Sequence, residues 1–298
     1  MRTARKAASV LLLGLAAMLA AGPGAGGVRA DSSRPQRIVS LTVCTDQLLL
    51  DLVDRDRIAA LTYLAVDPTV SMRVEDARGL KGVHWFAEEV LALQPDLVIA
   101  QEYSATGAVD MLRRLGFRVV LVPLATDFEG MRRAIRIMAE AVGDKARGEA
   151  VIAAFDKRIA AARPDGPERP RALAYEVNSV ALGDGSLVDA ALEAAGFHNV
   201  ARDAPLGPGG RLPLEEVVAH PPDLIVLANT PGEFRSIVGD NLRHPAFASV
   251  IASRPHVEVP MAQWLCATPN IAGAVEKLGA ERRALLAARS ASKAVPHE

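Results

Sequence analysis

The feature that most constrains the fold is a gapless internal repeat. Two fourteen-residue segments of this 298-residue chain align at an offset of 127 positions, with seven identities: AEEVLALQPDLVIA at 87–100 and LEEVVAHPPDLIVL at 214–227. Each segment has the pattern of a short helix, a Pro-Asp turn and a buried strand. Helix–turn–strand units also recur by chance in α/β proteins. One full copy in each half nevertheless favours two lobes of similar build.

Short apolar runs alternate with helical stretches along the rest of the chain. Continuous apolar strands of this kind are typical of parallel sheets covered on both faces, so the sequence predicts an α/β fold with mostly parallel sheets. Strands are predicted at residues 37–41, 58–62, 97–100, 118–122, 171–176, 224–228 and 256–259, and helices at 45–53, 88–93, 108–115, 128–142, 144–162, 187–195, 214–219 and 269–287.

A long helix is predicted between the two halves. Residues 144–162 are rich in good helix formers, and Gly148 is their one weak point. At about 1.5 Å per residue this helix is ~28 Å long. The predicted organisation is an N-terminal lobe at 31–142, a connecting helix at 143–164 and a C-terminal lobe at 165–298. A rigid connection of this kind permits only small changes in the angle between the lobes.

The first thirty residues have the pattern of a secretory signal peptide. Basic Arg2, Arg5 and Lys6 precede an apolar run, and small residues lead to a cleavage site near Ala30. The alternative is an uncleaved membrane anchor, but the run is short for a span of about 20 residues. Removing this segment takes away four basic and no acidic residues, which leaves a mature chain with a net charge near −5.

Composition and motifs argue against several classes of protein. Lys and Arg number 34 and Asp and Glu number 35, so the chain is not a basic protein built to coat nucleic acid. Secreted α/β proteins include hydrolases, but residues 183–186 (GDGS) lack the flanking pattern of a GxSxG nucleophile elbow. A GxxxxGK[ST] phosphate-binding loop is also missing from the sequence.

Several segments resemble a known family. They are RIVSLTVCTDQLLLDL at 37–52, EEVLALQPDLVIA at 88–100, LRRLGFRVVLV at 112–122, LPLEEVVAHPPDLIVL at 212–227, LRHPAFASV at 242–250 and PMAQWLCATPNIAGAVEKL at 260–278. Their order, together with the single long helix, resembles periplasmic substrate-binding proteins of ABC importers that serve vitamin B12, ferric siderophores and haem. The resemblance covers about Arg37 to Leu286.

The resemblance implies two α/β lobes joined by one helix, with a ligand cleft between them and no enzyme activity. It implies a monomer in the periplasm with no intrinsic cofactor, whose ligand is an iron or cobalt chelate: a ferric siderophore, haem or a corrinoid. It also implies delivery to an ABC permease at the inner membrane. In the family one surface glutamate on each lobe meets permease arginines, and the matching positions are Glu88 and Glu215. Glu89 and Glu216 match less clearly.

The aromatic residues agree with a cleft binder. The chain holds three Tyr and two Trp residues, and four of the five end or follow a predicted strand: Tyr63, Tyr103, Tyr175 and Trp264. Trp85 lies beside His84 in the loop before the first repeat helix. Ligands of open α/β sheets bind outside the carboxyl ends of the strands, so these rings are expected to face the ligand. The alternative is that they cap the core.

Polar residues near the same strand ends are further candidates. Cys44 and Thr45 open the first helix, whose N–H groups attract anionic or carbonyl groups, although Thr45 or Asp46 can instead cap that helix. Arg211, in a glycine-rich loop, can meet an acidic ligand or remain solvated, as can Arg73 and Arg78.

Direct metal binding by the protein has less support. The six histidines show no HxxxH or HxxE spacing, so no protein-held metal is assigned and a zinc- or manganese-binding importer protein is the alternative. Ligation of haem iron by Tyr63, Tyr103, Tyr175 or His84 stays open. Cys44 and Cys266 follow the first and last strands. In an oxidising compartment such a pair can join. A disulfide would lock the lobes and hinder release, so two separate, partly buried thiols are the favoured alternative.

Overall fold

The computed structural model describes residues 34–227 and 244–293. The predicted signal peptide at residues 1–30 lies outside these ranges, as does its cleavage site. With η marking 3-10 helices, the first half contains β1 (Ile38–Ser40), α1 (Val43–Leu52), η1 (Arg55–Arg57), β2 (Ile58–Thr62), η2 (Tyr63–Val66), α2 (Val74–Ala77), β3 (Gly82–Val83), α3 (Ala87–Leu91), β4 (Leu97–Gln101), α4 (Thr106–Arg114), β5 (Val119–Val122) and α5 (Phe128–Ala141).

The rest of the described chain runs from a long helix to the C-terminal helix. It contains α6 (Lys145–Ala161), β6 (Arg171–Tyr175), η3 (Val177–Ser179), β7 (Val180–Ala181), α7 (Leu187–Ala194), β8 (His198–Asn199), η4 (Val200–Asp203), β9 (Gly210–Arg211), α8 (Leu214–Ala219), β10 (Leu224–Leu227), α10 (Pro245–Ser253), β11 (His256–Glu258), α11 (Met261–Trp264) and α12 (Ile271–Lys293).

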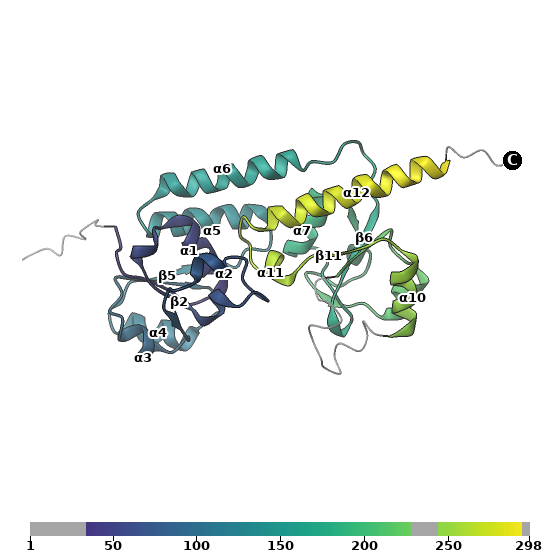
Figure 1. The fold of residues 1–298 in the computed structure, drawn as a ribbon. Coiled ribbons are helices and arrows are strands. Elements are labelled where there is room, and N and C mark those ends of the chain that lie inside the picture. The colour runs from purple at the N-terminus through teal and green to yellow at the C-terminus, as the bar shows by residue number, and fades with distance from the viewer. Residues whose placement is uncertain (1–33, 228–243, 294–298) are drawn as a thin grey trace, which may run out of the picture. The chain divides into compact units, whose positions relative to one another are not determined.

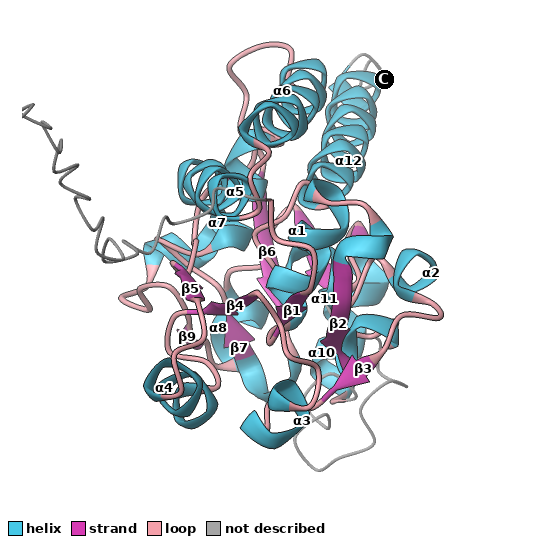
Figure 2. Ribbon diagram, turned by 90° about the vertical axis from the view of Figure 1, so that its left-hand side faces the viewer, coloured by secondary structure: helices cyan, strands magenta, loops and turns pink. Residues whose placement is uncertain are grey.

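The first sheet is parallel throughout and has the order β3-β2-β1-β4-β5. Its side chains alternate between two apolar layers, as the period of two in a strand requires. Ile38 and Ile99 pack on the side of α1 and α5, whereas Val39 and Val98 pack on the side of α3 and α4. Helices therefore cover both faces (Figure 2), which explains the continuous apolar strands in the sequence.

The second sheet is mixed and has the order β11-β10-β6-β7-β9, with β8 also pairing with β6. Strands β6, β8, β10 and β11 pair in parallel, while β7 runs antiparallel to β6 and β9. The chain reverses tightly after β6 because Asn178 and Ser179 both have a positive φ. The prediction of an α/β fold with two sheets is confirmed, and this reversal adds antiparallel strands to the second one.

The predicted long helix forms as α6, a single uninterrupted helix. Asp144 caps it by accepting a hydrogen bond from the Arg147 backbone N–H at 3.1 Å. The weak point expected at Gly148 has another role, because a Cβ there would lie 2.5 Å from the Ala139 Cβ. Gly148 therefore lets α6 pack closely on α5. Towards its C-terminal end α6 also packs against α12 (Figure 1), where Arg158 forms an ion pair with Glu276 at 2.8 Å.

One apolar core extends under both sheets on the side of the long helices. It includes Ile99 from the first sheet, Phe155 from α6, Leu224 from the second sheet and Leu278 from α12. Independent movement of the two halves would break this shared packing, which favours small relative motions. The lobe boundaries expected at residues 142 and 165 stay a prediction.

Candidate ligand-binding cleft

A pocket of about 540 Å³ opens at the carboxyl ends of the first sheet. All five strands of this sheet are parallel, so the loops that follow them meet at one edge, where α/β folds bind ligands. The lining residues are Leu41, Thr42, Val43, Cys44, Thr62, Leu64, Trp85, Gln101, Ser104, Ala105, Leu124, Ala125, Leu265 and Ala267. We call this the main pocket.

The lining of the main pocket is apolar, with a few uncharged polar groups. Its described lining contains no Asp, Glu, His, Lys or Arg side chain. Polar atoms come from Thr42, Thr62, Gln101 and Ser104. An apolar surface with a few hydrogen-bonding groups suits a large ligand that carries uncharged polar substituents.

A second pocket of about 350 Å³ adjoins the main pocket and shares Leu124, Ala125 and Leu265 with it. It brings in residues from the second half, including Leu182, Ser186 and Leu187. Glu176 is the one charged side chain in its described lining, and burial raises the pKa of that carboxyl. The two pockets together form the cleft between the halves that the fold prediction included.

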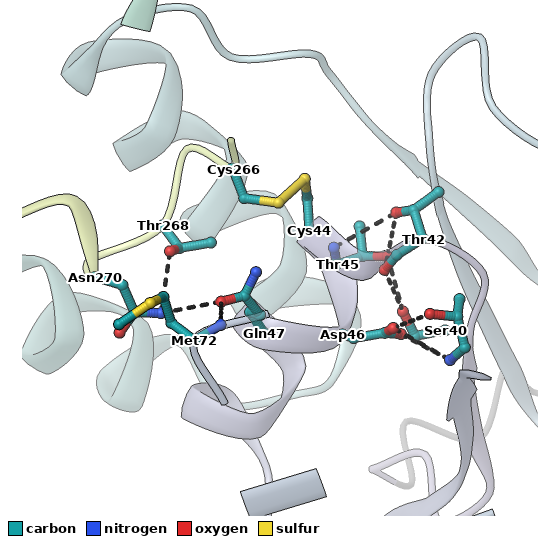
Figure 3. The surroundings of a disulfide bond; sticks show 11 residues. Ser40, Thr42, Cys44, Thr45, Asp46, Gln47, Met72, Cys266, Thr268 and Asn270 are labelled. Atoms are coloured by element: carbon teal, nitrogen blue, oxygen red, sulfur yellow. Dashed lines mark hydrogen bonds between the residues drawn. A yellow bond between two sulfur atoms is a disulfide. The ribbon is translucent and has the colours of Figure 1, made fainter. Parts of the chain in front are cut away.

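A disulfide joins the two halves at this cleft, so the expectation of two separate thiols is wrong. Cys44 and Cys266 are bonded, with their Cα atoms 5.1 Å apart (Figure 3). The chain after α11 returns to α1, where the Asn270 amide donates to Gln47 Oε1 at 3.2 Å. Gln47 Oε1 also accepts from the Met72 backbone N–H at 3.1 Å. These contacts hold the two cysteines within bonding distance. Because they are 222 positions apart in the chain, the sequence gives no sign of this proximity.

Three of the predicted aromatic residues stand together at the rim. The Tyr63 ring lies 4.7 Å from the His84 ring and 5.6 Å from the Trp85 ring, measured between centroids. Trp85 is 44% exposed and contributes directly to the main pocket. His84 hydrogen-bonds through its ring Nδ1 to Glu89 at 3.1 Å. These rings form one aromatic cluster, and Trp85 is the member that lines the main pocket.

Tyr103 and Arg211 are exposed but lie outside the lining of both pockets. Tyr103 is 87% exposed and has a φ of 66°, a backbone conformation that a bulky residue seldom adopts. Its neighbours Ser104 and Ala105 line the main pocket. Arg211 forms part of β9. Their roles as ligand contacts remain predictions.

Two predicted ligand residues are structural instead. Thr45 is buried within α1, and its hydroxyl bonds to Ser40 Oγ at 2.8 Å and to the Thr42 carbonyl at 3.0 Å. Thr42, not Thr45 or Asp46, caps this helix. Tyr175 is fully buried in the second half, and its hydroxyl donates to the Leu212 carbonyl at 3.1 Å. Burial therefore removes both side chains from the cleft surface.

Trp264 is also placed differently from the expectation. It is 3% exposed and belongs to the core beneath the second pocket, with its indole N–H buried and without a hydrogen-bond partner among the described residues. Its ring contributes to the wall of that pocket but offers no free face for stacking. Trp264 follows the strand end of β11 as expected, but the packing of α11 buries its ring.

Asp46, and three residues that line the main pocket, Gln101, Ser104 and Leu124, were not predicted as site residues. Asp46 is buried behind the main pocket and accepts hydrogen bonds from the Thr62 backbone N–H at 3.1 Å and from the Thr62 hydroxyl. Burial raises the pKa of the Asp46 carboxyl to about 7. Gln101, Ser104 and Leu124 line the main pocket. Their positions at or after the ends of β4 and β5 are a usable sequence signal for this edge of the sheet.

In both halves, the second glutamate of the repeated pair contacts a histidine and the first does not. Glu89 contacts His84, and Glu216 contacts His220 at 3.6 Å. Glu88 and Glu215 are exposed at the first turns of α3 and α8, and their carboxylates form no hydrogen bond or ion pair with any described residue. The first glutamate of each pair is thus available to a partner.

Among residues 34–227 and 244–293, no helix is long and apolar enough to cross a membrane. The same part of the chain contains no group of three or more His, Cys, Asp or Glu residues placed to hold a metal ion.

The sheets and the two pockets together define the class: a two-lobed α/β protein with a cleft at the strand ends. Residues 38–257 match the family described as periplasmic binding protein, and the chain belongs to this family. The resemblance found in the sequence is therefore confirmed. Since the family and its matched members are solute-binding proteins, the chain is a binding protein and not an enzyme.

Named relatives include a cobalamin-binding protein of Halobacterium salinarum. It is 30% identical over 203 residues, which is 65% of this chain and 54% of the relative, so the match spans about half of that protein. An uncharacterised ABC transporter substrate-binding lipoprotein of Bacillus subtilis, YvrC, is 26% identical over 121 residues, which is 40% of this chain and 38% of YvrC.

Solved structures show the same fold. The periplasmic haem-binding protein RhuT of Roseiflexus sp. RS-1 superposes with a TM-score of 0.66 at 24% identity, covering 82% of this chain and 96% of RhuT. The periplasmic vitamin B12-binding protein BtuF of Vibrio cholerae gives a TM-score of 0.62 at 17% identity, covering 85% and 98%. At these identities the likeness concerns the fold alone.

Proposed function

We propose that the protein captures a metal chelate in the periplasm and delivers it to an ABC importer, and that the chelate is a corrinoid. The observation that carries the choice of ligand is that the described residues lining the main pocket are all uncharged. Haem has carboxylates and catecholate siderophores are anionic, so either ligand favours basic side chains in its site. A corrin ring instead carries a rim of uncharged carboxamides. The cobalamin-binding relative from Halobacterium salinarum supports the same choice.

The test is titration calorimetry of the mature chain with cyanocobalamin, haemin and a ferric tris-catecholate. We expect one-to-one binding of cyanocobalamin, at least about tenfold tighter than either competitor, a gap of ~1.4 kcal/mol. Tight binding of haemin or the ferric catecholate without binding of cyanocobalamin would contradict the corrinoid assignment. Binding of free zinc or manganese alone would support the alternative of a metal-ion importer protein.

Trp85 provides the residue-level test. It stands at the rim of the main pocket with one side against Tyr63. If its ring stacks on the ligand, Trp85→Ala weakens affinity by about 1–3 kcal/mol, and Trp85→Phe retains most of it. Val66→Ala is the matched control, because Val66 is exposed and lies outside both pockets. Equal affinity of Trp85→Ala and the wild type would remove this ring from the site.

Delivery depends in this proposal on Glu88 and Glu215. Both carboxylates are exposed and unpaired among the described residues, one in each copy of the internal repeat. Glu88→Ala and Glu215→Ala should leave ligand affinity within about twofold, the range expected of exposed surface sites, while impairing uptake, most of all together. Glu89→Ala and Glu216→Ala serve as controls, since their carboxylates already contact histidines. Normal uptake by the Glu88/Glu215 double variant would end the docking assignment.

Export and oligomeric state complete the proposal. The basic–apolar–small pattern of residues 1–30 supports secretion with cleavage near Ala30. N-terminal sequencing of periplasmic material should therefore begin at or near Asp31, and an intact Met1 in the membrane fraction would contradict this. Light scattering after size exclusion should give the mass of a monomer.

A further inference from the structure

A groove with both polar and apolar lining lies between α3 and α4, next to the mouth of the main pocket. It has a volume of about 500 Å³, and we call it the α3–α4 groove. Trp85, Phe86 and Met111 line it, with exposed fractions of 44%, 55% and 42%. Three large apolar side chains around one depression are more than the scattered single ones that soluble surfaces usually show. Such a patch marks a contact surface.

The floor of the groove is built to stay open. Gly107 and Ala108, at the start of α4, contribute little side-chain volume. No heavy atom lies within 4 Å of an ideal Cβ placed on Gly107. Residues with larger side chains would fill this space from within the chain. The groove therefore has room for an apolar side chain from another molecule.

Glu88 gives the groove its charge. It is the one charged residue in the lining, and its carboxylate has no partner among the described residues. A matching occupant is a segment that carries a large apolar side chain next to an arginine or lysine. The groove also shares Trp85 and Ala105 with the main pocket, so this occupant would lie beside the cleft mouth.

The second half repeats the arrangement on a smaller scale. Glu215 lies in a pocket of about 320 Å³ together with Leu214, Val218, Ala219 and His244. Val218 is an exposed large apolar residue, like Phe86 in the first half. An unpaired glutamate beside an apolar depression thus occurs in both copies of the repeat. One partner that spans both halves explains the duplication better than two unrelated contacts.

We propose that the α3–α4 groove receives an apolar side chain of the importer's membrane permease while Glu88 meets a basic residue beside it. This inference rests on the proposed delivery function and adds an apolar anchor to it. It predicts that docking depends on the shape of the groove as well as on the charge of Glu88. Apolar anchors seated in pockets commonly dominate interface energies, whereas rim charges mainly steer association.

The test measures binding of the full mature chain to its purified permease complex in nanodiscs by biolayer interferometry. Phe86→Ala removes one wall of the groove and Gly107→Leu fills it. Each should weaken binding at least about fivefold, as expected for a contact at a well-packed anchor. Leu115→Ala and Arg113→Leu are the controls, because both residues are exposed and lie outside the groove. The controls should bind like the wild type, and all four variants should keep its melting temperature.

The outcomes separate the groove from the delivery function. Wild-type binding by both Phe86→Ala and Gly107→Leu would overturn the groove proposal. If Glu88→Gln alone weakens binding, docking through charge stands without the groove. Failure of the wild type itself to bind the permease would overturn the groove and the proposed delivery together. A wild-type dimer that Gly107→Leu dissociates would identify the groove as a contact between copies of this chain and also overturn the proposal.

Discussion

Replacing both cysteines by alanine should destabilise the protein strongly. The Cys44–Cys266 bond joins residues separated by 222 positions, so nearly the whole described chain lies inside the loop that it closes. The chain-entropy relation gives about 5 kcal/mol for a loop of this length, and measured effects of native disulfides are commonly about 2–5 kcal/mol. Alanine avoids burying a new hydroxyl at Cys266, which is 2% exposed. We therefore expect Cys44→Ala/Cys266→Ala to lose several kcal/mol of unfolding free energy.

The assay follows each half of the molecule by its own tryptophan. The chain has two Trp residues, and they lie on different parts of the fold, Trp85 beside the first sheet and Trp264 on α11. Single-tryptophan variants, Trp85→Phe and Trp264→Phe, are unfolded in guanidinium chloride with and without the disulfide. With the bond intact the two transitions should coincide. Without it both midpoints should fall, and the two transitions should separate if the halves lose their coupling.

Two results would refute the reasoning. The first is a midpoint of the double alanine variant equal to that of the oxidised wild type. The second is detection of two free thiols in wild-type protein unfolded without reductant, because the bond would then be missing. Wild-type protein reduced with dithiothreitol is the matched control, and it should unfold like the double alanine variant.

Three further predictions follow from buried groups and close packing. Burial raises the pKa of Asp46 to about 7, above its ordinary value of 3.8, so the folded state holds this proton more tightly. The contribution of this proton to the free energy of unfolding is therefore complete below about pH 4 and is lost as pH rises to 7. Between these values the free energy of unfolding should fall by up to about 1.4 kcal/mol per pH unit. Asp46→Asn should remove this slope when the free energy is measured by chemical denaturation. An unchanged slope in that variant would contradict the shift. Gly148→Ala should lower the free energy of unfolding by about 1–3 kcal/mol, because the new Cβ would clash with Ala139, even though alanine has the better helix propensity. Gly107→Ala is the comparison: its Cβ would lie in open space, so this variant should be neutral or stabilising by up to about 1 kcal/mol. Equal melting temperatures for these two alanine variants would argue against close packing at Gly148. Solution scattering with and without cyanocobalamin should give nearly the same radius of gyration, because α6, the shared core and the disulfide all connect the two halves; a large compaction would show a hinge.

Much of the fold could be predicted because its signals are local. The strand Ile58–Thr62 and the helix Leu214–Ala219 have the predicted bounds, and the apolar run at 97–100 lies within β4. Hydrophobic period, turn residues and helix formers act over a few neighbouring positions, so a sequence displays them directly. Because the repeat occurs once in each half of the chain, it also predicted two halves of similar build.

The site could be predicted only in part. Topology places residues after parallel strands at one edge, and Trp85 and Cys44 do line the main pocket there. Whether a ring at that edge faces the cleft or the core depends on packing between elements. Tyr175 follows the same rule as Trp85 but is enclosed by the apolar layer on one face of the second sheet.

The sequence by itself determined the α/β class, the two halves and the long helix between them, since these follow from patterns within short segments. Tertiary structure alone decided the disulfide, the burial of Trp264 and the separate roles of Glu88 and Glu89. The disulfide and the burial of Trp264 depend on which distant surfaces meet, and the pairing of Glu89 depends on how the nearby loop before α3 folds back onto it. The return of the chain from α11 to α1 brings Cys266 to Cys44, and the loop before α3 places His84 against Glu89 while Glu88 stays unpaired. Contacts between segments far apart in the chain leave no periodic signal in the sequence, because they arise from the packing of the folded elements.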